Sequence, residues 1–282
     1  MPCPTLENRP GTTGGTAHAL LLAPFILPWS MFSGLMTLIF GVLRLRRVCT
    51  FVLVAWGRAI VATSRVRVVV HGREHLKSSE RYFFLSNHQS ALDIPVLFQA
   101  CGGEFHPRFM AKESLFKIPF FGWGMRGGGF IPIRRESARH SAEMFKAMQR
   151  EFIRYSYINF PEGTRSEDGR LQPFKRGAIG LALRLKVPIV PVTIIDACRA
   201  NPKARICLRP GTVHVVFHEP VQPGPGTARD ELMARLHATI GSALPEEQKA
   251  RGSGSGTGGP GTETGGTDIS DICAPKAQEA KK

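Results

Sequence analysis

The chain has 282 residues, of which 37 are Lys or Arg and 22 are Asp or Glu, so its formal net charge is +15. The hydrophobic content of 43% excludes a wholly disordered chain, the glycines lack the three-residue period of collagen, and the length allows one sizeable core or two small domains. A pI near 10.1 predicts an anionic partner: nucleic acid, an acidic membrane surface or a phosphorylated small substrate.

The first predicted element is an uncharged run. A polar segment, residues 1–18, precedes 25 residues without a charge, 19–43. At about 1.5 Å per residue, a helix of this length crosses a hydrocarbon core roughly 30 Å thick. A cleaved signal peptide is disfavoured, because the run is too long and no basic stretch precedes it. Pro24 and Pro28 leave an alternative open, in which the ordered helix begins only near Trp29 and lies in the membrane interface.

Arginines without any acidic residue follow this run. Seven of them fall within residues 44–73, the first being Arg44, Arg46 and Arg47. A second apolar stretch, 48–64, is interrupted by Arg58, which favours an interfacial or packed helix over a spanning one. We therefore predict membrane-embedded or interfacial helices over residues 19–64. The positive-inside rule places the rest of the chain at the cytoplasmic face of the inner or plasma membrane, and anionic lipid headgroups are favoured over nucleic acid as partners of the arginines.

Strand and helix patterns alternate over residues 65–246, which predicts an α/β domain with a mixed, mainly parallel sheet flanked by helices. Apolar runs predict strands at residues 66–71, 82–86, 130–134, 157–160, 189–195, 204–208 and 212–218. Periodicity predicts helices from about residue 95 and over 137–154, 175–186 and 227–244, the last capped by Thr227. Residues 247–282 are rich in Gly, Ser and Thr, and we predict a disordered tail without a catalytic part.

The first segment with chemical potential is Asn-His-Gln-Ser-Ala-Leu-Asp at 87–93, directly after a predicted strand. If a helix begins near Pro95, the loop before it can fold His88 back toward Asp93. The two would then be a general base and the carboxylate that orients it. Spacing alone leaves open that Asp93 is only a helix cap and His88 a loop residue. Ser90 as a nucleophile is a weaker alternative, because no Gly-x-Ser-x-Gly elbow surrounds it.

The second segment is Phe-Pro-Glu-Gly-Thr-Arg-Ser at 160–166, where a predicted strand ends. Ligands bind at strand ends in α/β sheets, Gly163 lets the backbone approach closely, and Arg165 can clamp a phosphate with two hydrogen bonds. Glu162 can orient that guanidinium or bind a substrate hydroxyl. Ordinary turn chemistry with an exposed arginine is the alternative.

Other basic residues are candidates for the same phosphate pocket, although each alone is typical of a protein surface: Lys112, Arg134 with Arg135, and Lys175 with Arg176. Gly122, Gly124 and Gly127 have the spacing of a dinucleotide fingerprint, but a strand-like run follows them instead of a helix, so we reject that interpretation. The six cysteines include no Cys-x-x-Cys pair and no His at zinc-ligand spacing, which predicts no metal site and a reducing compartment.

Taken in order, these segments resemble the phospholipid-synthesis acyltransferase family, most closely the 1-acyl-sn-glycerol-3-phosphate acyltransferases. Residues 87–93 match the His-x4-Asp block of the family, 160–166 the Glu-Gly-Thr-Arg block and 187–192 the proline-containing fourth block. Residues 130–134 match the block that ends in arginine, although Ile133 stands where an acidic residue is usual. Lys112 fits a further basic block. The resemblance covers about residues 66–220.

The resemblance implies that His88 removes the proton from a glycerol hydroxyl that attacks the thioester of acyl-CoA or acyl carrier protein, with Asp93 orienting His88. It implies that a phosphorylated acceptor, lysophosphatidate, is bound by Lys112, Arg134, Glu162, Gly163, Thr164 and Arg165. No metal or other cofactor is expected, because a thioester is already activated. Phosphatidate for phospholipid synthesis would be the product, and the expected partners are the lipid acceptor, the acyl donor and an anionic membrane surface, without nucleic acid.

Two alternatives stay open at this point. Within the family, the acceptor can be another lyso-lipid such as lyso-ornithine lipid, whereas glycerol 3-phosphate is disfavoured by the intact Pro-Glu-Gly-Thr-Arg segment. From another class, the chain can be a non-enzymatic basic protein that binds lipid or nucleic acid through its charge, with binding that weakens steeply with salt.

Overall fold

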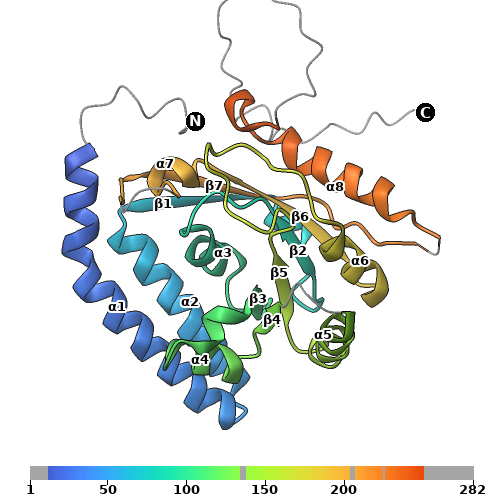
Figure 1. Ribbon diagram of the computed structural model, residues 1–282, viewed down its shortest axis with the longest axis horizontal. Coiled ribbons are helices and arrows are strands. Elements are labelled where there is room, and N and C mark those ends of the chain that lie inside the picture. Colours follow the sequence, from blue (N-terminus) through green and yellow to red (C-terminus); the bar gives the residue numbers. More distant parts are fainter. Residues whose placement is uncertain (1–11, 134–137, 204–206, 225, 251–282) are drawn as a thin grey trace, which may run out of the picture.

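The computed structural model describes residues 12–133, 138–203, 207–224 and 226–250, which form helices around a seven-stranded sheet (Figure 1). The strands are β1 (Val66–His71), β2 (Phe83–Ser86), β3 (Pro107–Lys112), β4 (Ile131–Ile133), β5 (Ser156–Asn159), β6 (Ile189–Ile195) and β7 (Gly211–Phe217). Their order is β1-β7-β6-β2-β5-β3-β4. Neighbours are parallel except β6 and β7, so β1 and β7 run opposite to the other five. The predicted mixed, mainly parallel sheet is confirmed.

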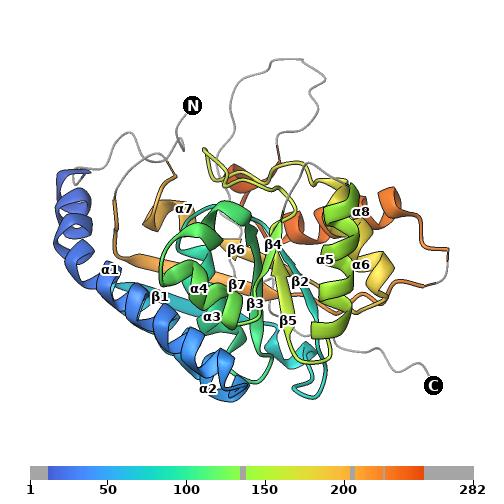
Figure 2. The same ribbon diagram turned by 60° about the horizontal axis from the view of Figure 1, so that its bottom comes forward.

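Helices cover both faces of this sheet (Figure 2). The α-helices are α1 (Thr12–Val42), α2 (Arg46–Thr63), α3 (Asp93–Cys101), α4 (Phe121–Gly127), α5 (Ala138–Glu151), α6 (Arg176–Leu185), α7 (Ala197–Ala200) and α8 (Arg229–Ser242). Short 3₁₀ turns are η2 (Arg73–His75), η3 (Glu113–Lys117) and η4 (Glu246–Gln248). One apolar core lies on the side of α2 and α3, and a second lies on the side of α5, α6 and α8.

The central strand β2 contributes to both cores. Phe84 belongs to the core beside α2 and α3, whereas Phe83 and Leu85 belong to the other, and none of the three is exposed. Successive side chains of a strand point to opposite faces, so a strand covered on both sides is continuously apolar. The carboxyl end of β2 is thereby fixed in the middle of the sheet, where the loop carrying His88 begins.

Helix α1 covers the predicted uncharged run. It is continuous from Thr12 through Pro24 and Pro28 to Val42, so the alternative start near Trp29 is wrong. Both prolines are exposed, while the opposite face of α1 packs against α2 and α4. Tertiary packing of one face supplies most of the stability of a helix in a protein, which explains why two missing N–H donors do not end this one.

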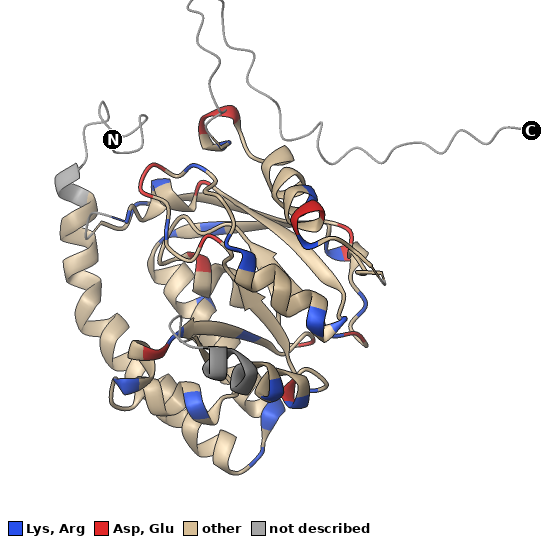
Figure 3. Cartoon of the chain, turned by 45° about the vertical axis from the view of Figure 1, so that its right-hand side comes forward, with Lys and Arg blue, Asp and Glu red and all other residues tan. Residues whose placement is uncertain are grey.

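Much of α1 is apolar and exposed. Its large exposed side chains include Leu21 at 78% and Leu27 at 63%. Residues Gly15–Val42 form the one helical stretch, within the described ranges, that is long and apolar enough to cross a bilayer. Figure 3 shows no charged residue along α1 and a gathering of Lys and Arg near its carboxyl end. Helix α2 is shorter, carries Arg58, and buries one face against α1 and α3.

Glycines bring α1 and α4 into backbone contact. A Cβ atom built on Gly124 would lie 2.2 Å from the carbonyl oxygen of Gly34, and one on Gly41 would lie 2.1 Å from that of Gly127. Small residues let helix backbones approach this closely. Gly124 and Gly127 therefore belong to the crossing with α1, whereas Gly122 packs against the backbone of Phe116. All three lie inside α4 rather than in a strand-to-helix turn.

We expect Gly124→Ala to lower the free energy of unfolding by about 2 kcal/mol, because the added methyl group meets backbone atoms of Gly34 that cannot rotate away. Thermal unfolding in detergent, followed by circular dichroism, measures the effect. Gly177→Ala is the matched control. A Cβ there meets nothing within 4 Å, and alanine favours the helix, so its stability should stay level or rise. Equal melting temperatures for the two variants would contradict this account of the crossing.

Three local predictions are wrong. Cys207 and Leu208 are not in a strand; Leu208 N donates to the carbonyl of Gly15 instead, and the rest of the predicted strand, 204–206, lies outside the described residues. Ala228, not Thr227, occupies the N-cap position of α8, and the Thr227 hydroxyl bonds to Gly224 O. The folded domain extends past residue 246, because Gln248 is 1% exposed. Residues 251–282 of the predicted tail lie outside the described residues.

Candidate functional site

The two segments singled out in the sequence meet at one edge of the sheet. Strands β2 and β5 are parallel neighbours, with Phe84 opposite Ile158 and Leu85 opposite Asn159. Their carboxyl ends therefore emerge side by side, and the loop that follows each strand begins at the same level. This register brings His88, two residues beyond β2, to Glu162, three residues beyond β5: the backbone N–H of His88 donates to Glu162 Oε1 over 3.0 Å.

Asn87 fixes the start of the first loop. Its side-chain amide donates to the carbonyl oxygen of Ile194 over 2.8 Å, and its Oδ1 accepts the N–H of the same residue over 2.8 Å. Asn87 is 1% exposed and so replaces the ladder hydrogen bonds that β2 and β6 no longer make at this point. Asn87 lies in the block that resembles the family, but no local pattern indicates this role, because its partner lies 107 residues away.

His88 and Asp93 form a buried pair. His88 Nδ1 lies 2.7 Å from Asp93 Oδ2, and that oxygen also accepts the backbone N–H groups of Gln89 over 2.7 Å and Ser90 over 2.8 Å. The side chain of Asp93 is fully buried and that of His88 is 15% exposed. The carboxylate thus holds the loop around itself. In the tautomer that carries its proton on Nδ1, the imidazole donates to this carboxylate and Nε2 is the nitrogen with a free lone pair.

The side chain of Asp93 does not cap α3. Asp93 is the first residue of α3 rather than its cap; the N-cap position is Leu92, without a side-chain capping bond. The carboxylate of Asp93 binds the N–H groups of the preceding loop instead. Ser90 is not activated by His88 either, since its hydroxyl is buried and donates to the backbone oxygen of Asn201 over 2.8 Å.

The imidazole of His88 is held from its other side by Phe160. The two rings stack with centroids 3.9 Å apart and an angle of 12° between their planes. The His88 carbonyl oxygen accepts the N–H of Ser166 over 2.8 Å, which ties the two loops together a second time. Within the described part of the chain, Nε2 has no hydrogen-bond partner. The ring is therefore held at Nδ1 by Asp93 and on one face by Phe160, and its Nε2 is available to a ligand.

Glu162 and Gly163 shape the second loop. Glu162 is 4% exposed, and burial, with the nearby negative charge of Asp93, raises the pKa of its carboxyl group well above the ordinary value. Gly163 has φ +77°, a left-handed conformation that side chains rarely adopt, so the turn here requires glycine. Glu162 is therefore a buried residue that supports the His88 loop. The sequence also allowed an ordinary surface turn at this position, and Glu162 does not lie in one.

We expect Glu162→Gln to change how the melting temperature depends on pH. Because its pKa is raised, Glu162 keeps its proton to a higher pH in the folded state than in the unfolded chain, which releases this proton above about pH 4.3. The wild-type stability contributed by this group is complete below that pH and is lost as the pH rises through the folded pKa. Glutamine keeps an acceptor for His88 N–H but cannot ionise. The melting temperature of the variant relative to wild type should therefore rise with pH.

Thermal unfolding at a series of pH values from 4 to 8 measures this difference. Glu231→Gln is the control, because Glu231 is exposed on α8 and forms no ion pair among the described residues. Its difference from wild type should stay flat across the series. A flat difference for Glu162→Gln as well would show that Glu162 ionises normally in the folded protein.

The predicted basic residues are not all brought together. Arg165 is partly exposed and, with the exposed Thr164, lines a cavity of about 830 Å³ that Lys203 and His237 also line. Lys112 is exposed at the carboxyl end of β3, and no contact or common cavity of the described residues joins it to Arg165. Arg134 and Arg135 lie outside the described residues. Arg176 is occupied on the surface by Asp230, 2.8 Å away.

The chemistry open to this arrangement is proton transfer next to a bound anion. An imidazole whose Nδ1–H is held by a buried carboxylate can take a proton at Nε2 and carry the resulting positive charge, which the carboxylate stabilises. Arg165 follows the Glu162–Thr164 turn directly, so an anionic ligand at that loop would lie beside the His88 loop. The site therefore suits the activation of a hydroxyl group on a negatively charged molecule.

Comparison with known proteins gives consistent results. The family model described as Acyltransferase matches residues 67–195. The chain is 38% identical over 156 residues to the chloroplastic 1-acyl-sn-glycerol-3-phosphate acyltransferase BAT2 of Brassica napus, covering 54% of this chain and 44% of that protein. It is 31% identical over 202 residues to the 1-acyl-sn-glycerol-3-phosphate acyltransferase of Limnanthes douglasii, covering 70% of each.

A solved structure shares the fold. The crystal structure of the 1-acyl-sn-glycerophosphate (LPA) acyltransferase PlsC from Thermotoga maritima has a TM-score of 0.67 and 28% sequence identity, covering 80% of this chain and 91% of that chain. This chain spans about half the length of several curated plant and algal relatives that it matches. The matched segment contains both loops of the site and five of the seven strands complete. The chain belongs to the acyltransferase family that includes these 1-acyl-sn-glycerol-3-phosphate acyltransferases.

Proposed function

We propose that this protein transfers a fatty acyl group from acyl-CoA or acyl carrier protein to the free sn-2 hydroxyl of lysophosphatidate and so makes phosphatidate. The observation that carries the proposal is the His88–Asp93 pair, 2.7 Å apart, whose open Nε2 lies at the edge of the sheet where the Glu162–Arg165 loop also emerges. The names of the relatives support the same reaction. The chemistry needs no metal or other cofactor, because a thioester is already activated.

In the proposed mechanism, Nε2 of His88 removes the proton from the acceptor hydroxyl as its oxygen attacks the thioester carbonyl carbon. Asp93 stabilises the imidazolium that forms. The tetrahedral intermediate then collapses, its carbon–sulfur bond breaks, and the leaving thiolate takes the proton from His88. The products are the new ester and a free thiol. Phe160, stacked on the ring, and the Nδ1 bond keep Nε2 directed at the substrate throughout.

Arg165 is proposed to bind the phosphate of the acceptor, because a guanidinium pairs with phosphate oxygens through two charge-assisted hydrogen bonds. Glu162, Gly163 and Thr164 shape the loop that presents Arg165, and Lys112 and Arg134 are proposed as further phosphate contacts. The fatty chain of a substrate requires an apolar environment. A small apolar cavity of about 80 Å³, lined by Phe109, Phe130 and other side chains, adjoins the site, since Phe109 stacks on the Phe160 ring.

Membrane association is part of the proposal. The exposed apolar length of α1 and the arginines at its carboxyl end support a position at an anionic, cytoplasmic membrane surface. A lipid acceptor then enters the site sideways from the bilayer, whereas the soluble donor arrives from the aqueous side.

Acyl transfer by the purified protein in detergent and lipid tests the proposal. Acyl-CoA or acyl carrier protein is offered with lysophosphatidate, lyso-ornithine lipid, lysophosphatidylcholine or glycerol 3-phosphate, and products are identified by mass spectrometry. Product from lysophosphatidate alone is expected. Product from another lyso-lipid alone would overturn the acceptor and keep the chemistry, and no product with either donor would leave the non-enzymatic basic protein as the explanation.

We expect Arg165→Ala to raise the KM for lysophosphatidate by tenfold or more, since a hydrogen bond to a charged group contributes about 1.5–3 kcal/mol. Steady-state kinetics at varied acceptor concentration measure the change. The control is Arg235→Ala on the exposed side of α8, which removes the same charge and should leave KM within twofold of wild type, on the small effect expected of an exposed charge. An unchanged KM in Arg165→Ala would remove Arg165 from the acceptor site.

A further inference from the structure

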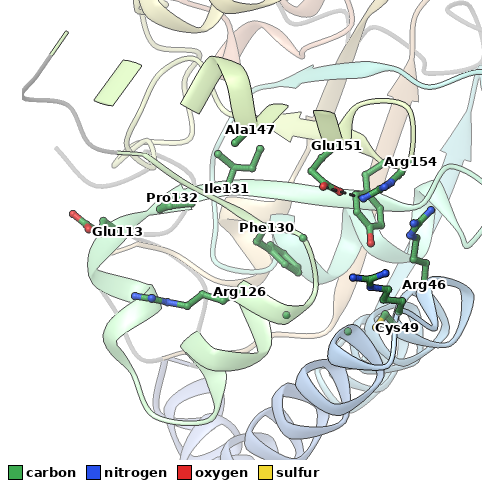
Figure 4. A pocket seen from close by; sticks show the side chains of 15 residues that line it. Arg46, Cys49, Glu113, Arg126, Phe130, Ile131, Pro132, Ala147, Glu151 and Arg154 are labelled. Carbon is green, nitrogen blue, oxygen red and sulfur yellow. Dashed lines mark hydrogen bonds and ion pairs between the residues drawn. The ribbon is translucent and has the colours of Figure 1, made fainter. Parts of the chain in front are cut away.

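A second cavity, with four arginines in its lining, lies away from the His88 site. It encloses about 700 Å³ between the carboxyl ends of α1 and α5, the segment after α4, and β4 (Figure 4). We call it the basic cavity. Its charged lining residues are Arg44, Arg46, Arg126, Arg154, Glu113 and Glu151. His88, Asp93, Glu162 and Arg165 do not line it, so the proposed reaction makes no use of it.

Positive charge is in excess in the basic cavity, where four arginines and two carboxylates, those of Glu113 and Glu151, form the charged lining. Glu151 pairs with Arg154 over 3.1 Å (Figure 4), but no carboxylate of the described residues pairs with Arg44, Arg46 or Arg126. The four arginines come from three separate parts of the chain: the α1–α2 turn with the first residue of α2, helix α4, and the turn after α5. Repulsion between like charges destabilises such a cluster unless an anion is present. The arrangement therefore favours a bound anion.

A buried arginine, Arg108, lies next to a lining residue of the basic cavity. Arg108 on β3 is 0% exposed, and its guanidinium lies 4.4 Å from the ring centre of Tyr155, a lining residue. It donates to the carbonyl oxygens of Gly128 and Pro107 and to Thr50 Oγ1, all of which are neutral. A buried charge is costly without a counter-charge, and Arg108 has no carboxylate partner among the described residues. An anion in the basic cavity would supply the missing negative charge.

The position of the cavity indicates what kind of anion it takes. Arg44 follows the carboxyl end of α1 directly, and the apolar side chains around the turn are exposed: Val42 at 71%, Leu43 at 59% and Phe51 at 71%. If α1 lies in a bilayer, the arginines stand where lipid phosphates lie and the apolar side chains face the acyl region. A soluble anion would use only the arginines, whereas a lipid would use both.

We propose that the basic cavity binds the phosphate of an anionic glycerophospholipid of the surrounding membrane, at a site separate from that of the acceptor. Guanidinium groups from the α1–α2 turn, α4 and the turn after α5 surround the phosphate, and the lipid chains lie against the apolar turn. The site fixes the depth and rotation of the catalytic domain at the membrane surface. The inference rests on the membrane association of the proposed function, but not on the acyl transfer reaction.

Equilibrium binding to the full-length protein in a neutral detergent tests the proposal. The probes are dihexanoyl phosphatidylglycerol, which is neither the proposed acceptor nor its product, zwitterionic dihexanoyl phosphatidylcholine, and inorganic phosphate. Arg126→Gln is the main variant, because Arg126 lines the basic cavity from α4. Arg47→Gln is the matched control, because Arg47 lies in the same basic turn but lines a neighbouring cavity instead.

We expect wild type to bind phosphatidylglycerol saturably and more tightly than phosphatidylcholine. Arg126→Gln should weaken that binding about tenfold, and Arg44→Gln similarly, as loss of a charge-assisted hydrogen bond implies. Arg47→Gln should change it less than twofold. Acyl transfer to lysophosphatidate in detergent should be unchanged in Arg126→Gln, so failure of the proposed reaction, which would appear in wild type, is distinguishable from failure of this site.

Three results would overturn the proposal. Equal weakening by Arg47→Gln and Arg126→Gln would mean that diffuse charge, not a site, attracts the lipid. Competition by millimolar inorganic phosphate together with equal affinity for both lipids would identify a soluble-anion site. Saturable binding of acyl carrier protein, lost in Arg126→Gln while lipid binding is retained, would identify an acidic protein as the occupant.

Discussion

Replacing His88 by alanine is expected to lower kcat for acyl transfer by about 10²–10⁴-fold, the usual contribution of a positioned general base. The imidazole contacts the Asp93 carboxylate through Nδ1 and the Phe160 ring through its face. No other described residue occupies the position of its Nε2 atom. Single-turnover and steady-state assays with acyl-CoA and lysophosphatidate measure the loss. Binding of the variant to anionic vesicles should be unchanged, because the basic residues are intact.

His75→Ala is the control for His88→Ala. His75 follows β1, which runs opposite to β2, so it lies at the other edge of the sheet, and it contacts the carbonyl oxygen of Phe217. Its replacement should leave kcat within twofold of wild type, since no part of the reaction reaches that edge. Activity in His88→Ala within threefold of wild type would exclude His88 as the base and leave the transfer reaction to another group.

Asp93→Asn is expected to lower kcat by about 10³-fold while the protein stays folded, because asparagine cannot stabilise the imidazolium and can hold the ring in the wrong tautomer. Asparagine has nearly the same shape, and its carbonyl oxygen can still accept the N–H groups of Gln89 and Ser90. The NH₂ group of the asparagine would take the position of the present Asp93 Oδ1, which has no hydrogen-bond partner. That buried donor costs about 1–3 kcal/mol of stability, which thermal unfolding measures.

This variant separates two roles of Asp93. A purely structural carboxylate is replaced well by asparagine, which caps helices and turns about as effectively as aspartate. A kcat within tenfold of wild type would therefore assign Asp93 to loop structure alone. A large loss of kcat with little change in KM, in a protein that still unfolds cooperatively, would assign it to the charge that develops on His88 during the reaction.

The two proposals together assign positioning on the membrane to the basic cavity and the acyl transfer step to the His88 site. A lipid phosphate held by Arg126 and Arg44 sets how the domain sits on the membrane, and the His88 loop then faces lipids at a fixed depth. In this arrangement, variants of the basic cavity should reduce acyl transfer from vesicles while leaving transfer in detergent intact. Variants of His88 or Asp93 reduce both.

The amino-acid sequence by itself determined the elements whose pattern is local. Strand β6 lies at the predicted residues 189–195 and β1 at 66–71, because continuous β-branched runs are distinctive over a few residues. The loop between β2 and α3 also follows from its sequence, since Pro95 in the first turn of α3 leaves residues 88–92 outside the helix. The pairing of His88 with Asp93 was one of two open interpretations, and both residues lie within a single short loop.

Only the tertiary structure decided the features whose partners are distant. Strand β3 was not predicted, because Pro-Arg-Phe-Met-Ala-Lys is unlike a buried strand until Arg108 is seen to bond with Gly128 and Thr50. The prolines of α1 left a helix start near Trp29 open, and the structure excludes it because packing on α2 and α4 outweighs local propensity. Glu162 reaches His88, and Gln248 reaches Gln89 across 159 residues, only after the sheet aligns its strands. Burial and long-range hydrogen bonds depend on the whole chain, so no window of sequence contains them.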